Sequence, residues 1–480
     1  MPRRSNGGST ATAALQLTGA IVVRLRKPAR MRNIELGLLA FAFLLVGAAF
    51  VLVELAVNGQ VYAHWVWYLI CLGLLVLVLH VVLRVTAPEA DPFIVPVGVL
   101  LNGIGLAEIH RIDLAKGFSG WEAVGIRQIV WTGIALVFAI GALLLVRNHR
   151  LLQRYRYLAM LTGIVLLVLP MLPGLGMEVN GARIWVNLGV ASFQPGEFAK
   201  VALAVFFAGY LVTARDSLSM AGKRILGLRL PRARDFGPIL VVFAASMIVL
   251  VAQHDLGTAL LYFGLFLVML YVATGRGSWI AIGVILFVAG VWVASRFLTY
   301  VNGRIDGWLN PFDQANYDAT GGSYQLVQGL FGLAAGGVFG TGLGRGRPGI
   351  TPLSQSDFII SSLGEELGLV GLFAILALYL LFVGRAFRVA FAGADDFGRL
   401  LAVGLGFAIA LQVFIVVGGV TRVIPLTGLT TPFLAAGGSS LVANWIIAAL
   451  ILRLSDGVRS GPRIVIGPET GEQRRLVVGG

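Results

Sequence analysis

The chain has 480 residues, of which 58% are hydrophobic and 12% are charged. Soluble domains carry about 25% charged residues, so the composition excludes an ordinary soluble protein, and successive apolar runs of about 20 residues predict membrane-spanning helices. The formal net charge of +14 belongs largely to short loops between these runs, which argues against a nucleic-acid partner. A single cysteine and five scattered histidines leave no disulfide framework and no dedicated metal cluster.

Residues 1–33 form a basic segment without the apolar stretch and small-residue site of a cleavable signal. We expect a cytoplasmic tail that fixes the topology of the chain. An alternative role is contact of its arginines with anionic membrane lipid.

A hydropathy window then predicts an all-α polytopic protein with about twelve transmembrane helices. Two leading helices occupy 34–90, a ten-helix core occupies 91–455, and a second cytoplasmic tail follows at 456–480. The predicted spans are 35–56, 64–84, 92–109, 124–146, 157–174, 197–213, 237–253, 256–274, 278–298, 367–390, 398–420 and 432–454.

The distribution of basic residues sets the orientation of these helices. Most arginines and lysines lie in the tails and in alternate loops, which places both termini inside by the positive-inside rule. Three segments then lie outside together: 178–196, 302–366 and 421–431. The segment 302–366 is the only long one without a spanning run, and its aromatic and aliphatic content predicts a structured functional loop rather than disorder.

Two ionisable residues open the sixth predicted span. Glu197 and Lys200 are three positions apart, so both lie on one face of a helix. Ionisable side chains within a membrane-spanning segment are costly to bury and usually belong to a functional site. They form either a salt bridge that holds two helices together or a polar cavity in which Lys200 faces a phosphate, and both roles are compatible.

Two outer turns carry further candidates. Arg183, next to Trp185, offers a planar guanidinium suited to phosphate; the alternative is an ordinary arginine and aromatic residue at the membrane interface. Asp255 lies in a tight turn between two spans, where we expect it to cap the following helix rather than to take part in chemistry.

The long outer segment holds a glycine-rich run at 336–349. Its backbone N–H groups, with Arg345 and Arg347, are candidates for binding an anion, although the run matches neither familiar phosphate motif and a flexible hinge is the alternative. Asp357 lies among apolar residues, which raises the pKa of a carboxyl group and suits a general base. We expect Glu365 and Glu366 to be structural acids at the start of a helix.

Several short motifs follow one another along the chain: NGARIWVNLG (180–189), QPGEFAK (194–200), QHDLGTA (253–259), SDFI (356–359), GEELG (364–368), PLTGLTTPF (425–433) and GGSS (437–440). Together these motifs resemble the SEDS family (shape, elongation, division and sporulation). The similarity runs from about residue 91 to 454, and the elongation-type branch is closer than the division-type branch. The chain departs from the usual family pattern at Gly196, His254 and the pair Ala435 and Ala436.

This resemblance implies a peptidoglycan glycosyltransferase that polymerises lipid II in the bacterial cytoplasmic membrane during cell elongation and shape maintenance, with its active site on the outer face. It implies a class B penicillin-binding protein as the crosslinking partner. The family's essential outer-loop aspartate falls on Asp357, its polar pair in the central cavity on Glu197 and Lys200, and the basic residue of its first outer loop on Arg183.

We therefore expect an inverting transfer of a growing glycan from polyprenyl pyrophosphate onto lipid II. Asp357 would act as the base, and Arg183, Lys200, Arg345 and Arg347 are candidates to stabilise the leaving pyrophosphate. No cofactor is expected with certainty, and a divalent cation (Mg or Mn) could assist. The alternatives are a lipid II flippase, a division-type polymerase, and a scaffold that only recruits a synthase.

Overall fold

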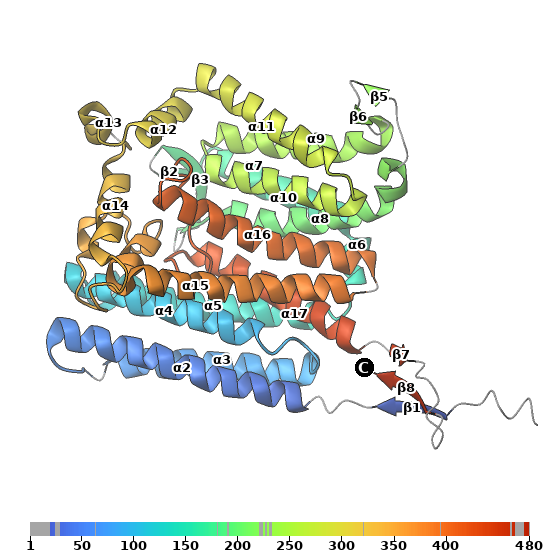
Figure 1. Ribbon diagram of the computed structural model, residues 1–480, viewed down its shortest axis with the longest axis horizontal. Helices are drawn as coiled ribbons and strands as arrows, with labels where there is room; N and C mark the ends of the chain where they lie inside the picture. Colours follow the sequence, from blue (N-terminus) through green and yellow to red (C-terminus); the bar gives the residue numbers. More distant parts are fainter. Residues whose placement is uncertain are drawn as a thin grey trace, which may run out of the picture.

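The computed structural model describes residues 20–24, 29–62, 64–179, 181–189, 192–219, 224–225, 228–229, 233–319, 321–393, 395–460, 463–465 and 475–479. The described chain is a bundle of long apolar helices with short elements at both ends (Figure 1). The bundle helices are α2 (Ala29–Asn58), α3 (His64–Thr86), α4 (Ile94–Lys116), α5 (Val124–Leu145), α7 (Arg156–Val168), α8 (Pro195–Ser219), α9 (Ala233–Ala252), α10 (Leu256–Thr274), α11 (Ser278–Phe297), α15 (Ile359–Ala392), α16 (Asp396–Val420) and α17 (Gly438–Ser460).

Each of the twelve predicted spans coincides with one of these helices. Within the described residues, ten helices are long and apolar enough to cross a membrane, while the helices at 156–171 and 239–252 are apolar but shorter. Helices satisfy all of their backbone hydrogen bonds internally, which is what a hydrocarbon environment requires. The prediction of an all-α polytopic membrane protein is confirmed.

The most buried helices of the bundle are α4, α8, α16 and α17, and α11 is the least buried. Aliphatic and aromatic side chains of the central helices form one continuous core. The leading pair α2 and α3 packs on this core against α4 and α5, so it is part of the bundle.

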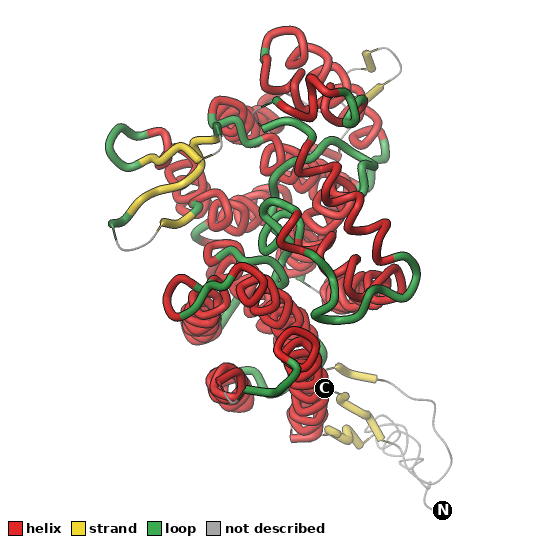
Figure 2. Tube along the Cα trace, turned by 90° about the vertical axis from the view of Figure 1, so that its left-hand side faces the viewer, coloured by secondary structure: helices red, strands yellow, loops and turns green. Residues whose placement is uncertain are grey.

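The outer segments carry short elements at one end of the bundle. They are η1 (Gly120–Glu122), η2 (Leu169–Met171), β2 (Gly176–Val179), β3 (Ala182–Asn187), β4 (Ser192–Phe193), α12 (Thr299–Leu309), α13 (Gln314–Asp318), α14 (Tyr324–Gly336) and η3 (Pro348–Ile350). Strands β2, β3 and β4 form an antiparallel sheet that stands out from the helices when the bundle is viewed from this end (Figure 2). The loop at 302–366 is therefore structured, as predicted.

The opposite end holds α6 (Arg150–Arg154), the strand pair β5 (Arg224–Ile225) and β6 (Leu228–Arg229), and the strands nearest the two ends of the chain. There β1 (Ala20–Arg24) pairs in parallel with β8 (Arg475–Gly479), and β8 pairs antiparallel with β7 (Arg463–Val465). Both ends of the described chain therefore lie at the same end of the bundle (Figure 1). Most of the predicted first tail lies outside the described residues.

Several predicted boundaries were wrong: α4 ends at Lys116 rather than 109, and α17 runs from Gly438 to Ser460 rather than over 432–454. Two helix starts also differ from the prediction. Helix α2 starts at Ala29, inside the predicted tail, because Arg32 finds buried partners there. Helix α15 starts at Ile359, eight residues before the predicted span at 367–390, and it breaks at Gly368, whose φ of 67° is non-helical. Glycine takes this conformation readily, and a side chain there would clash with the backbone of the glycine-rich run.

Candidate functional site

Asp357 lies two residues before α15, where the long outer segment ends. Burial raises the pKa of its carboxyl group to about 6, while a hydrogen bond from Ser356 and the positive charge of Arg304 oppose this rise. The α-carbon of Gly428 faces it, since a β-carbon there would lie 3.7 Å from Oδ2 of Asp357. A carboxyl group with a pKa near neutrality is suited to proton transfer.

Arg304 of α12 is the cation that the structure brings to Asp357, and sequence reasoning did not select it. Its guanidinium donates a 2.8 Å hydrogen bond to the carbonyl of Leu426. Burial lowers the pKa of Arg304, and the charges of Asp255 and Asp357 act to raise it. The only sequence signal was an arginine in an aromatic outer segment.

The third outer segment was predicted at 421–431, but it extends to 437 because α17 starts only at Gly438. This 421–437 segment connects the parts of the site. Arg304 bonds to its Leu426 carbonyl, and Trp308 of α12 donates to the carbonyl of Arg422 at 3.1 Å. The backbone N–H of Ala436 donates to the carbonyl of Gln355, two residues before Asp357. The segment therefore contacts both α12, which carries Arg304, and the stretch that carries Asp357.

Glu197 and Lys200 form the salt bridge that was one of their two predicted roles. Nζ of Lys200 lies 2.7 Å from Glu197 and 2.8 Å from Oε1 of Gln412 in α16. Gln412 in turn donates to the carbonyl of Thr430 at 2.9 Å. Lys200 is only 1% exposed, so in this structure it joins α8, α16 and the 421–437 segment and has no free face for a headgroup.

Arg183 lies in the exposed part of the β2–β3 sheet. Its backbone N–H donates to the carbonyl of Gln253 at 3.1 Å, and His254 bonds to the carbonyl of Gly181 at 3.0 Å. The sheet is therefore tied to the 253–255 turn. There Asp255 accepts a 2.9 Å hydrogen bond from the backbone of Thr258, so it caps α10 as predicted.

The glycine-rich run binds carboxylates, but they belong to the chain itself. Glu366 accepts hydrogen bonds from the backbone of Gly344 at 2.7 Å and Gly346 at 3.2 Å, and Glu365 accepts one from Arg347 at 2.7 Å. The expectation that the two acids stabilise a helix start was wrong, because α15 begins earlier and they instead hold the run in place. The side chains of Arg345 and Arg347 are exposed, and within the described part of the chain neither forms a hydrogen bond or an ion pair with Asp357, on which the charge of Arg304 acts instead.

An apolar groove of about 730 Å³ runs between α5 and α7 and is floored by α8 and α17. Its lining includes Trp131, Leu166, Ala202 and Ile446, and it reaches Phe193 of β4 and Ser439 at the end of the bundle that carries the outer segments. A groove with this lining is suited to an aliphatic chain. No local pattern of residues predicted this groove, because its lining comes from helices that are distant in the chain.

Among the described residues, no group of three or more histidine, cysteine, aspartate or glutamate side chains could hold a metal ion. The oxygen atoms of a pyrophosphate are of the type that Mg²⁺ and Mn²⁺ prefer.

The fold and this site define an integral membrane protein with a carboxylate, Asp357, at the point where its long outer segment meets the 421–437 segment. The model of the FtsW/RodA/SpoVE family, described as a cell cycle protein, matches residues 92–460. The chain belongs to this family.

Similar proteins agree with that assignment. The chain is 46% identical to the peptidoglycan glycosyltransferase RodA of Mycobacterium tuberculosis over 89% of its length and 91% of that protein. It is 34% identical to the stage V sporulation protein E of Bacillus subtilis over 76% of its length and 96% of the relative.

Solved structures give the same fold. A chain from a peptidoglycan synthase complex that coordinates polymerization and crosslinking has a TM-score of 0.61 and 26% identity, and the match covers 78% of this chain and 99% of that one. The rod shape determining protein RodA of Thermus thermophilus has a TM-score of 0.52 and 26% identity, covering 76% of this chain and 96% of that protein.

Proposed function

We propose that this chain is an elongation-type peptidoglycan glycosyltransferase that polymerises lipid II, with Asp357 as its general base. The observation that carries the proposal is the carboxylate of Asp357, which burial brings to a pKa of about 6 between Arg304 and Gly428. Its relatives named as peptidoglycan glycosyltransferases support the reaction class.

The reaction is an inverting glycosyl transfer. The 4-hydroxyl group of the lipid II sugar attacks the anomeric carbon of the donor glycan, and a new C–O bond forms as the bond to the polyprenyl pyrophosphate breaks. Asp357 takes the proton of the hydroxyl group, and the pyrophosphate leaves as an anion. A base with a pKa close to the working pH is largely deprotonated and still accepts a proton efficiently.

The leaving pyrophosphate needs positive charge around it. Arg304 is the nearest candidate, because its charge already acts on Asp357. Arg183, Arg345 and Arg347 are exposed on the outer segments and are placed to meet the more distant phosphate or the glycan. Lys200 has a positioning role through Gln412, since it is enclosed by its own partners.

The apolar groove between α5 and α7 is proposed to hold the polyprenyl tail of one substrate. Its opening near Phe193 and Ser439 directs the attached pyrophosphate toward the outer segments. A divalent cation, Mg²⁺ or Mn²⁺, is proposed to bind the pyrophosphate oxygens and supply charge there.

The proposed location is the bacterial cytoplasmic membrane, with both termini in the cytoplasm and the outer segments on the external face. This orientation follows from the basic residues at the end of the bundle that carries both tails. A class B penicillin-binding protein is the proposed crosslinking partner, as the similarity to a chain of a synthase complex suggests.

The test is polymerisation of fluorescent lipid II by the purified full chain, alone and with its partner transpeptidase, read as a ladder of glycan strands on a gel. A ladder from the wild type that is absent with Asp357→Asn supports the proposal. If the wild type makes no ladder in either form but moves lipid II across vesicles, the chain is a flippase. A ladder of full intensity from Asp357→Asn would remove the aspartate from the mechanism.

A further inference from the structure

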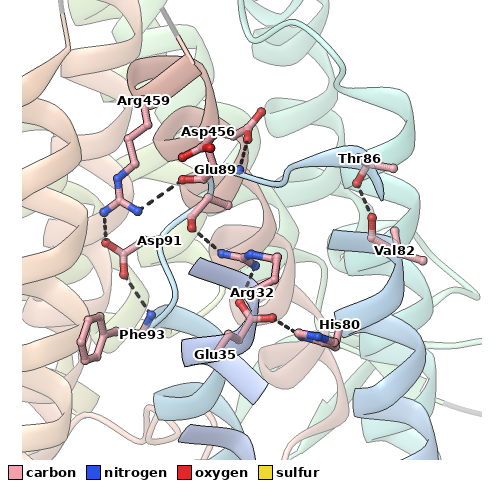
Figure 3. Close-up of polar contacts among 11 residues, drawn as sticks. Arg32, Glu35, His80, Val82, Thr86, Glu89, Asp91, Phe93, Asp456 and Arg459 are labelled. Carbon is pink, nitrogen blue, oxygen red and sulfur yellow. Dashed lines mark hydrogen bonds and ion pairs between the residues drawn. The ribbon is translucent and has the colours of Figure 1, made fainter. Parts of the chain in front are cut away.

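Helix α2 lies before residue 92, where the family model begins, so the family assignment gives it no role. At one end it is held by a buried polar cluster (Figure 3). Arg32 lies 2.5 Å from Glu35 and also donates to the carbonyl of Ala90, and Glu35 lies 2.7 Å from His80 of α3. This cluster ties α2 to α3 and to the segment that leads into α4.

The same segment is anchored to the catalytic core. Asp91 lies 2.8 Å from Nε of Arg385 in α15. It also lies 2.6 Å from Arg459 in α17 (Figure 3). Removing one partner of a buried ion pair leaves an uncompensated charge, so such contacts fix helices firmly in register. The position of α2 along the bundle is therefore set at this end.

At its other end α2 reaches the outer segments. Glu54 lies 2.8 Å from Nε2 of His110 in α4, and it also accepts a hydrogen bond from Asn58 at 2.7 Å. The residue after His110 is Arg111, which lies 3.1 Å from Glu366 and donates to the carbonyl of Gly346 at 2.7 Å. Neighbouring residues of α4 thus bind α2 on one side and the glycine-rich run on the other.

Helix α2 also touches this run directly. A β-carbon at Gly344 would lie 2.6 Å from Cβ of Ala56 and 3.2 Å from the carbonyl oxygen of Val53. Gly344 has a φ of +81°, a conformation that favours glycine. On its other side, Gly344 donates to Glu366. The run is therefore enclosed between α2 and the carboxylates of α15.

We infer that α2 is a positioning element of the glycosyltransferase site, in which Glu54 and Ala56 hold the 344–347 stretch against Glu365 and Glu366. These acids lie in the helical stretch 359–367, which begins two residues after Asp357 and is separated from the rest of α15 by the break at Gly368. Because the helix is interrupted at Gly368, contacts of its side chains help to hold this stretch in place. Among them, Glu365 and Glu366 bind the glycine-rich run, which in turn contacts α2. The inference rests on the proposed function for its catalytic consequence.

The consequence is a change in kcat more than in KM. Small displacements of a catalytic group reduce the rate strongly even when the substrate still binds. Loosening the 344–347 stretch should displace Asp357 without altering the apolar groove between α5 and α7. Partial unfolding of the bundle would also lower the apparent kcat at an unchanged KM, so the rate is expressed per folded enzyme and hydrogen exchange at 340–349 is measured beside it.

The experiment compares Ala56→Phe and Glu54→Gln with Leu55→Phe in the purified full chain. Leu55 is the matched control because it is adjacent and 47% exposed. Two quantities are measured: kcat and KM with fluorescent lipid II, and hydrogen exchange of the backbone amides at 340–349. For Ala56→Phe and Glu54→Gln we expect about a tenfold lower kcat, little change in KM, and faster exchange at Gly344 and Gly346, whereas Leu55→Phe should match the wild type.

Wild-type exchange and kcat in both test variants would overturn the inference. Faster exchange with an unchanged kcat would also overturn it, because the stretch would then be unconnected to catalysis. Equal effects of Leu55→Phe would reduce the role of α2 to general packing. The exchange measurement needs no turnover, so it tests the link between α2 and the glycine-rich run by itself. Failure of the proposed function would instead be seen as no glycan from the wild type, and the two failures are therefore distinguishable.

Discussion

Arg304 and Asp357 carry opposite charges at the point where the long outer segment meets the 421–437 segment. The charge of Arg304 lowers the pKa of Asp357, and the charge of Asp357 raises the pKa of Arg304, so each favours the ionised form of the other. Burial acts in the opposite direction on both groups. The pair explains how a partly buried carboxylate can be deprotonated near neutral pH and yet remain a base.

The first prediction concerns the carboxylate itself. Asp357→Asn keeps the size of the side chain and removes its ability to accept the proton, so polymerisation should fall by about 10²- to 10⁴-fold. The thermal midpoint in detergent should be unchanged or slightly higher, because a neutral amide is easier to bury than a charge. Ladder intensity and a thermal unfolding curve on the same preparation measure both, and a large fall in midpoint would attribute the loss to unfolding.

The second prediction concerns pH. The base must be deprotonated, so the rate should rise about tenfold per unit below pH 6 and level off above it, following the pKa of about 6. The positive charge of Arg304 lowers this pKa, so Arg304→Gln should move the acid limb to higher pH, by about one unit. Arg304→Lys retains the charge and serves as the control. The profile of kcat against pH gives the answer, and an unmoved limb in Arg304→Gln would contradict the electrostatic link.

The third prediction concerns the buried pair of α8. Breaking it with Lys200→Met leaves Glu197 buried without its cation, and this should cost about 3–5 kcal/mol of stability. The double variant Lys200→Met with Glu197→Gln removes both charges and should recover a large part of that loss. Equilibrium unfolding of the four proteins in a double-mutant cycle measures the coupling. Additive effects would show that the two residues act independently.

The fourth prediction concerns the apolar groove. Ala202→Phe places a ring in its floor and should raise KM for lipid II several-fold with a smaller effect on kcat, since the tail then binds less well. Val241→Phe on α9 is the matched control, because Val241 is exposed away from the groove. Steady-state kinetics of both variants decide the point. An equal KM for the two would mean that neither substrate tail occupies the groove.

The fifth prediction concerns the metal. Chelation with EDTA should stop polymerisation, and Mg²⁺ or Mn²⁺ should restore it, because the proposed cation binds the pyrophosphate. The thermal midpoint of the substrate-free chain should not change with EDTA, since the described residues hold no cluster suited to a metal. Full polymerisation in EDTA would leave the arginines to supply the charge.

The sequence alone was sufficient for the membrane architecture. Apolar runs must be helical in hydrocarbon, and their period and length can be read locally, so all twelve helices and the structured outer loop could be predicted. The general-base candidate Asp357 could also be selected, because its type and its apolar neighbours are adjacent in the chain. The salt bridge between Glu197 and Lys200 followed from a spacing of three residues.

Only the tertiary structure placed residues that are distant in sequence. Arg304 is 53 positions from Asp357 in the numbering, and nothing in the spacing brings them together. Glu365 and Glu366 resembled acids of a helix start until the fold gave them the amides of the glycine-rich run as partners. The contact of Ala56 with Gly344 joins segments almost 300 residues apart. Local periodicity determines which segments become helices, but the contacts between them depend on how those helices pack, and a single sequence does not encode that packing in any local pattern.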